Sequence, residues 1–270
     1  MRITGSTSAW KNDLDHALAR LRALGFEEID LIVIESWGLV SLAALVKDFE
    51  REASRVEALL SKHGLRAVSV NTAFNPDLHD RAAAAGNTAR LAEVRALARL
   101  MTRLGIRIGA HYPGYVADWK NDADGVWRDT TASLREIQLV LAEFPGTRLA
   151  PELHYRTPFE SPAAARRLLR EFPELPYTYE PSHFIVQGID WRETGDLLDG
   201  AAHVHLRGCA PNRLQAPPTE SEEALRWVVG RLKARDYRGM ISIEYLPEAD
   251  FDVELAIVEL RTKIRQWSED

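Results

Sequence analysis

Short apolar runs alternate along the chain with longer segments of helical spacing. Residues 29–36 read IDLIVIES, a nearly continuous aliphatic run that predicts a strand covered on both faces. Before it, leucines recur every three or four residues between positions 14 and 24, and Gly25 follows as a stop signal. This order predicts parallel strands joined by outer helices.

Eight such pairs follow one another without a Ser/Gly-rich linker, a low-complexity stretch or a block of like charge. Eight strand–helix units in one chain of this length are typical of a (β/α)₈ barrel, and a doubly wound open sheet is the alternative. We therefore predict a single α/β TIM-barrel domain over residues 1–270. The expected strands are 2–6, 29–36, 66–72, 106–112, 147–154, 177–183, 202–208 and 239–245. The expected helices are 13–25, 41–63, 80–104, 122–144, one opening at 161, 191–198, 221–234 and 251–267.

Composition narrows the class of protein. The 270 residues are 46% hydrophobic, enough for a large core, and the net charge of −6 argues against a nucleic-acid partner. Cys209 is the single cysteine, which excludes an intramolecular disulfide and fits a reducing compartment. The N-terminal residues have no apolar signal region, and no apolar run reaches the roughly 20 residues of a membrane span. We expect a cytoplasmic protein without a membrane partner.

Polar residues gather where the expected strands end. In such a barrel the active site is built at these C-terminal strand ends. Because side chains alternate along a strand, Arg207 should face the same way as the histidines two and four residues before it. The residues at the ends of the fourth to eighth strands are His111, Glu152, His154, Glu180, His183, His203, His205 and Glu244.

Three carboxylates converging on one barrel mouth would repel each other, and their burial without partners would be costly. A divalent cation removes this cost. Three carboxylates and one imidazole from the last four strands suit Mn²⁺ or Mg²⁺ best, with Co²⁺ or Zn²⁺ also compatible. A lone Glu at a strand end is more often a salt-bridge partner or a helix cap, so the prediction rests on the set.

Other candidates have simpler alternatives. His111 lies in the turn GAHYPG, which could be plain turn chemistry. Trp37 falls, with Trp10 and Trp119, in loops above the expected barrel mouth. Aromatic walls suit the faces of sugars, but packing is the commoner role. We read Cys209 as structural, because no base partner is evident near it in sequence.

The order of motifs resembles a known superfamily. HYPG follows the fourth strand, PELH lies on the fifth, Glu-x-x-His on the sixth, HVH on the seventh and IEY on the eighth. Over nearly its whole length the chain resembles the xylose-isomerase-like TIM barrels, which include sugar isomerases, ketose 3-epimerases, hydroxypyruvate isomerase and endonuclease IV.

The resemblance implies a metal site and a substrate site. Ketose 3-epimerases of this group bind one divalent metal through Glu, Asp, His and Glu, which match Glu152, Glu180, His205 and Glu244. Their substrate-binding residues match His183, Arg213 and His111, although the spacing to Arg213 is about two residues longer here. We add His154, His203 and Trp37 as substrate-binding candidates. One departure stands out, since Glu180 replaces the usual Asp. It either ligates from a backbone set further back or turns aside and leaves three ligands.

Endonuclease IV is the competing function within the group. It needs a three-zinc cluster with additional His and Asp ligands, and the end of the third strand supplies Asn71 and no His. Together with the acidic balance, this disfavours DNA cleavage.

The chemistry that fits is proton abstraction next to a carbonyl through a metal-stabilised enediolate, on a keto-sugar or cyclitol. Glu152 and Glu244 would flank the substrate, one removing the proton and the other returning it. No Gly-rich phosphate loop stands out, which favours an unphosphorylated substrate. A lyase or dehydratase with the same site, or a metal-free sugar-binding barrel, are the alternatives. Many relatives are homodimers or tetramers, and the sequence does not choose between these states.

Overall fold

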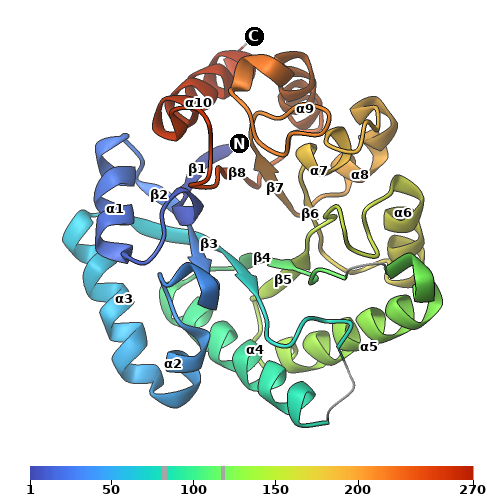
Figure 1. Cartoon of the computed structure of the whole chain (residues 1–270). Coiled ribbons are helices and arrows are strands. Elements are labelled where there is room, and N and C mark those ends of the chain that lie inside the picture. Colours follow the sequence, from blue (N-terminus) through green and yellow to red (C-terminus); the bar gives the residue numbers. More distant parts are fainter. Residues whose placement is uncertain (81–83, 117–118, 270) are drawn as a thin grey trace.

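The computed structural model of the chain describes residues 1–80, 84–116 and 119–269. Its eight strands are all parallel and follow the order β5-β4-β3-β2-β1-β8-β7-β6, with helices around the outside (Figure 1). The ring closes between β5 and β6, where Glu152 bridges to Thr178 and the Leu153 amide donates to the Thr178 carbonyl over 3.1 Å. The predicted TIM barrel is confirmed, and the open-sheet alternative is wrong.

The strands are short, and each lies within or beside a predicted one. They are β1 (Arg2–Ser6), β2 (Glu28–Val33), β3 (Arg66–Ala73), β4 (Ile108–Tyr112), β5 (Arg148–Pro151), β6 (Thr178–Tyr179), β7 (His203–Leu206) and β8 (Met240–Ile243).

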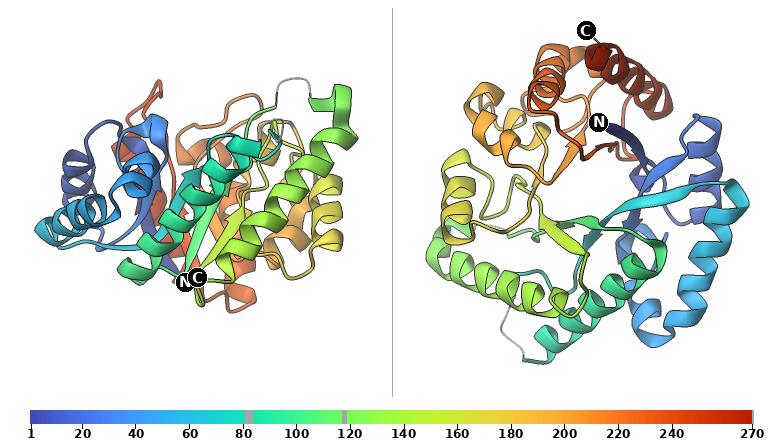
Figure 2. Two further views of the ribbon diagram at one scale, coloured as in Figure 1. Left: turned by 90° about the horizontal axis from the view of Figure 1, so that it is seen from below. Right: turned by 180° about the vertical axis from the view of Figure 1, so that it is seen from behind.

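The helices cover the outer face of this sheet. They are α1 (Leu14–Ala23), α2 (Leu42–Lys47), α3 (Phe49–His63), α4 (Ala84–Leu104), α5 (Ala123–Leu141), α6 (Pro162–Glu171), α7 (Ser182–Ile185), α8 (Gly195–Asp199), α9 (Glu222–Ala234) and α10 (Val253–Glu269). Both termini lie at the end of the barrel where the strands begin (Figure 2). The loops that follow the strands therefore gather at the opposite end. Among the described helices, none combines the length and apolar character needed to span a membrane.

One predicted helix is two. The segment 41–63 forms α2 and α3, which are separated at Asp48. Asp48 leaves the helical conformation with φ −150° and ψ 82°, and its carboxylate accepts a hydrogen bond from the Arg51 amide. An Asp side chain that bonds the backbone in this way begins a new helix rather than continuing the old one. The predicted start of the next helix, near residue 80, partly falls on residues 81–83, outside the described residues.

Capping residues predicted from sequence begin and end the helices around the barrel. The Ser161 hydroxyl accepts from the Ala164 amide, and Pro162 occupies the first turn of α6. Gly25 follows α1 with a φ of +81°, a conformation that favours glycine. Because these caps set where a helix begins and ends, they also set where the neighbouring strands lie along the barrel.

The barrel interior below the mouth carries buried polar side chains. The Asp30 carboxylate accepts hydrogen bonds from Ser6 over 3.1 Å and Ser69 over 2.5 Å. The hydroxyls of Thr4 and Ser242 lie 2.8 Å apart. All five side chains are buried. Barrel interiors are usually filled by large aliphatic residues, so this layer is a feature of the site above it rather than ordinary packing.

Gly109 in β4 is required by close packing. A Cβ atom at this position would lie 2.5 Å from Val70 Cγ2 and 2.8 Å from Leu149 Cδ2. We predict that Gly109→Ala lowers the free energy of unfolding by about 1–3 kcal/mol through overpacking. Gly230 in α9 is the matched control, because nothing lies within 4 Å of its added Cβ. Gly230→Ala should raise stability by about 0.5–1 kcal/mol. Urea unfolding measures both, and equal effects would contradict this packing.

Candidate active site

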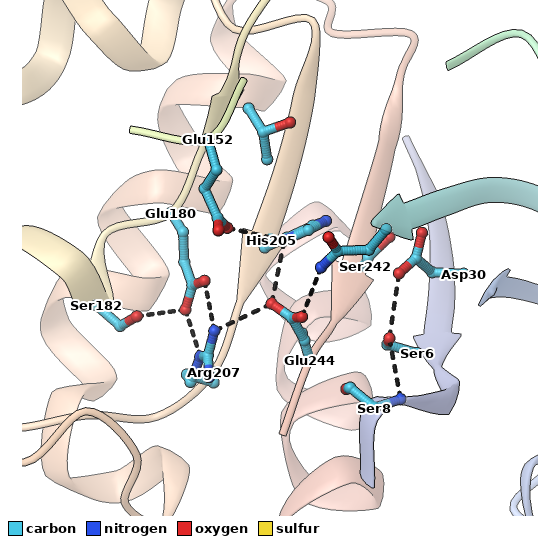
Figure 3. A network of polar contacts seen from close by, with 12 residues as sticks. Ser6, Ser8, Asp30, Glu152, Glu180, Ser182, His205, Arg207, Ser242 and Glu244 are labelled. Atoms are coloured by element: carbon cyan, nitrogen blue, oxygen red, sulfur yellow. Dashed lines mark hydrogen bonds and ion pairs between the residues drawn. The ribbon is translucent and has the colours of Figure 1, made fainter. Parts of the chain in front are cut away.

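Four side chains from the last four strands converge at the barrel mouth (Figure 3). Glu152 follows β5, Glu180 follows β6, His205 lies in β7 and Glu244 follows β8. One donor atom from each lies within 4.8 Å of the others, and all four residues are buried. The structure thus brings together the four residues that the sequence nominated as metal ligands.

His205 is the centre of this group. Its Nδ1 atom lies 3.1 Å from Glu152 Oε1 and 3.1 Å from Glu244 Oε2. On the far side of Glu244, the Asn71 amide donates to Oε1 over 2.7 Å. Asn71 comes from β3, and sequence reasoning noted it only as a position without a histidine.

Arg207 is the functional candidate that sequence reasoning missed. Its Nη2 atom lies 2.7 Å from Glu180 Oε2 and 3.0 Å from Glu244 Oε2, while Nε donates to Glu180 Oε1. The side chain is 4% exposed. The alternation of His203, His205 and Arg207 along one strand was the available signal, since it places all three on the inner face.

Glu180 turns toward the group but is already engaged. Glu180 makes a bidentate ion pair with Arg207, and its Oε1 atom also accepts a hydrogen bond from the Ser182 hydroxyl. His183 Nε2 lies 3.1 Å from Glu180 Oε2 and 3.6 Å from Glu152 Oε1. After β6 the chain passes through Pro181 directly into α7, which brings Ser182 and His183 back over the strand end.

The electrostatics of this group follow from burial and opposite charge. Burial alone would raise the pKa of the Glu152 carboxyl, but the charge of His183 and the bond to His205 hold it well below its usual value. Burial likewise opposes ionisation of Glu180, yet Arg207 and His183 depress its pKa. Burial would lower the pKa of His183, but Glu180 and Glu152 raise it to about 9. The carboxylates of Glu244 and Glu152 similarly raise the pKa of His205. Both imidazoles therefore hold a proton more readily than a free histidine does.

A cavity of about 380 Å³ opens above these residues. It is lined by Glu152, Glu244 and Arg207, by His154 and Trp37, and by Ile34, Asn71, Asp77, Tyr112, Leu214 and Leu246. The mixture of apolar walls with a few converging polar groups is typical of a small-molecule site. Trp37 is fixed there by its Nε1 atom, which donates to the Ser8 carbonyl over 3.2 Å.

The other nominated residues lie around this cavity rather than on its walls. His183 stands behind His154, with ring centroids 3.7 Å apart. His203 lies beneath the site, with Nε2 3.2 Å from Ser242 Oγ. His111 is buried beside Phe74, with ring centroids 5.9 Å apart.

Arg213 is half-exposed. It pairs with Glu220 over 3.0 Å and with Asp250 over 3.2 Å. The structure does not bring it to the cavity wall, so its predicted contact with substrate stays a prediction. The longer spacing after β7 is the physical reason, because it carries Arg213 past the strand end into a surface turn.

Asp30 was also missed. It offers a donor atom within 4.8 Å of donor atoms of His203 and His205, below the main group. Burial raises the pKa of the Asp30 carboxyl. Its role could not be predicted from sequence, because a single Asp inside the apolar run IDLIVIES reads only as an interruption of a strand.

The four donors fit a divalent cation. Carboxylate oxygens dominate the set, which suits Mn²⁺ or Mg²⁺. Their mutual separation, within 4.8 Å, allows all four to reach one ion. Arg207 contacts two of the four, and this contact is the feature that separates the site from a plain four-ligand cradle.

His111 should make stability depend on pH. Burial lowers its pKa to about 4, against about 6.5 in the unfolded chain. Between these values the unfolded state binds a proton that the folded state does not, so stability falls as pH falls from 6.5 to 4. In His111→Phe we expect the loss of unfolding free energy between pH 6.5 and 4 to be smaller by roughly 1–3 kcal/mol. Urea unfolding at several pH values measures it. The exposed-site control His16→Gln should keep the wild-type slope, and a wild-type slope in His111→Phe would contradict the prediction.

The fold is shared with solved structures of low sequence identity. A D-tagatose 3-epimerase-like protein superposes with a TM-score of 0.78 at 16% identity, covering 100% of this chain and 97% of the other. The 3-keto-D-glucoside 4-epimerase of E. coli gives 0.71 at 16%, covering 98% and 99%. A probable 3-DHS dehydratase from Bacillus anthracis gives 0.70 at 16%, covering 97% and 99%. A search of curated proteins finds no match.

The sequence itself carries a wider family signature. A family model described as xylose isomerase-like TIM barrel matches residues 18–265, which is most of the chain and includes every residue of the group at the barrel mouth. The resemblance inferred from the motifs is thereby confirmed. The chain belongs to the xylose isomerase-like TIM barrel family.

Proposed function

We propose that this chain is a divalent-metal-dependent sugar isomerase or epimerase that moves a proton next to the carbonyl of a keto-sugar or cyclitol. The observation that carries the proposal is the pair Glu152 and Glu244. Both carboxylates lie 3.1 Å from one imidazole atom, and both line the cavity. Two acid/base groups in one small-molecule cavity suit removal and return of a proton.

The cation would be held by the group described above, Glu152, Glu180, His205 and Glu244. When bound, such a cation stabilises negative charge that develops on a carbonyl oxygen, which makes the neighbouring C–H bond more acidic. Mn²⁺ or Mg²⁺ fits the oxygen-rich donor set best.

The two carboxylates differ in how many of their oxygens neighbouring side chains contact. Glu244 is held at both oxygens, by Asn71 at Oε1 and by Arg207 at Oε2. The contacts found for Glu152 within the described chain all fall on Oε1. We assign Glu152 as the group that takes the proton, because its Oε2 atom carries none of the contacts found within the described chain. Glu244 would return a proton. Return to the opposite face of the same carbon gives an epimer, and return to the next carbon gives an aldose–ketose exchange.

Neutral His154 suits a hydroxyl of the substrate. Burial lowers its pKa to about 3, so the ring is uncharged at neutral pH. Its Nδ1 atom lies 2.5 Å from the Tyr155 carbonyl and therefore carries the proton, which leaves Nε2 as an acceptor. Trp37 on the cavity wall offers a flat apolar face for a sugar ring.

A lyase is the second candidate, and the dehydratase of similar fold favours it. The same carboxylate could remove the proton, after which a hydroxyl on the next carbon leaves as water. A metal-free sugar-binding barrel is a third possibility, and the engagement of Glu180 by Arg207 is the observation in its favour.

Substitution of the carboxylates tests the acid/base assignment. We expect Glu152→Gln and Glu244→Gln to lower kcat by roughly a hundredfold or more, because the amide cannot take or give the proton. The circular dichroism spectrum should stay that of the wild type. Glu143→Gln, which changes an exposed ion pair with Arg95, should keep full activity. Near-wild-type turnover in both active-site variants would refute the assignment.

Solvent exchange tests the reaction class. The metal-free protein, prepared by chelation, is incubated in D₂O with a panel of keto-sugars and cyclitols, before and after Mn²⁺ is returned. We expect incorporation of one deuterium beside the carbonyl, only with the metal present, because the removed proton is replaced from solvent. Loss of water from the product mass would identify the lyase. Absence of exchange with every substrate and metal would leave the binding barrel.

A further inference from the structure

Arg207 contacts the same oxygens that a cation would need. One nitrogen, Nη2, lies 2.7 Å from Glu180 Oε2 and 3.0 Å from Glu244 Oε2. The second arm of the guanidinium, Nε, reaches Glu180 Oε1. An arginine in a protein stays protonated at every working pH, so this positive charge is permanent. It is also buried, with 4% of the side chain exposed.

Glu180 has little capacity left for another partner. A carboxylate offers about four acceptor positions. Arg207 takes one on each oxygen, and the Ser182 hydroxyl takes a second on Oε1. His183 Nε2 stands 3.1 Å from Oε2. A metal ion that binds Glu180 would therefore compete with these groups for the same two oxygens.

We propose that Arg207 is an internal competitor of the divalent cation, and that the metal enters the four-residue group only when the guanidinium releases Glu180 and Glu244. The inference rests on the proposed metal-dependent function. It concerns the affinity for the metal rather than the reaction.

Two consequences follow from the charges. A divalent cation and a guanidinium on the same two carboxylates repel each other, so the affinity for the metal is lower than the four ligands alone would give. Conversely, Arg207 stabilises the metal-free barrel, because it balances the buried negative charge of Glu180 and Glu244. The side chain has room to leave, because it borders the cavity of about 380 Å³.

Calorimetric titration of the metal-free protein with MnCl₂ tests the competition. Arg207→Met keeps an unbranched side chain but removes the charge and the donors. We expect it to bind Mn²⁺ roughly tenfold or more tightly than the wild type. The matched control is Arg166→Met, which removes a similar two-armed contact with Asp196, made on the surface with both arms 2.8 Å long. The control should bind as the wild type does. Equal or weaker binding by Arg207→Met would overturn the inference.

Thermal unfolding gives an independent reading. Without metal, Arg207→Met should melt below the wild type, because Glu180 keeps a buried charge without its main partner. Mn²⁺ should raise its Tm by more than it raises the Tm of the wild type. If this variant does not fold without metal, Arg207→Lys replaces it, since Lys keeps the charge but cannot make the two-armed contact. Lys should bind Mn²⁺ more tightly than the wild type, and unchanged affinity would overturn the inference.

The two proposals fail separately. If the wild type exchanges the proton of a keto-sugar with Mn²⁺ but Arg207→Met binds the metal no more tightly, the competition is refuted and the function stands. If Arg207→Met gains affinity but no keto-sugar reacts, the competition stands and the function falls.

Discussion

The burial of three carboxyl groups in one barrel mouth is the constraint to which the rest of the site responds. Glu152, Glu180 and Glu244 cannot be brought within contact of one another without positive charge. The chain supplies that charge from Arg207, and from His183 and His205, whose pKa values the carboxylates raise. The metal-free group is therefore held together by its own side chains. A cation that entered this group would take over the charge balance that Arg207, His183 and His205 already provide.

The barrel makes this arrangement possible through strand alternation. His203, His205 and Arg207 lie at successive levels, so β7 supplies a deep and a central histidine, and the residue directly after β7 supplies a guanidinium at the mouth. The hydroxyl and carboxyl layer beneath, around Asp30, gives the deep polar groups partners inside the barrel. Such a layer is less hydrophobic than a usual barrel core, and through Ser242 it gives His203 a polar partner.

The fold and most of the candidate site could be predicted from sequence, because each strand end is marked by a polar residue after an apolar run. The fold followed from eight repeats of one pattern, and Glu152, Glu180, His205 and Glu244 followed from their places in it. Arg207 could not be assigned a role, because the direction of a side chain does not reveal which carboxylate it will meet. Asn71 and Asp30 come from distant strands, and only closure of the sheet brings them to His205 and Glu244. The position of Arg213 depended on the path of a surface turn, which spacing alone does not determine.

The join between β5 and β6, where the barrel closes, is also where the charged side chains of the site meet. Strands β5 and β6 meet through a single bridge at Glu152 and Thr178, and β6 is two residues long. His183 reaches from the end of β6 toward Glu152 across this seam, while Glu180 is tied through Arg207 to β7 and to Glu244. The charged group therefore adds a side-chain contact where β5 and β6 share little backbone pairing. The same residues form the candidate active site and bridge this part of the barrel, so a substitution at one of them is expected to affect both.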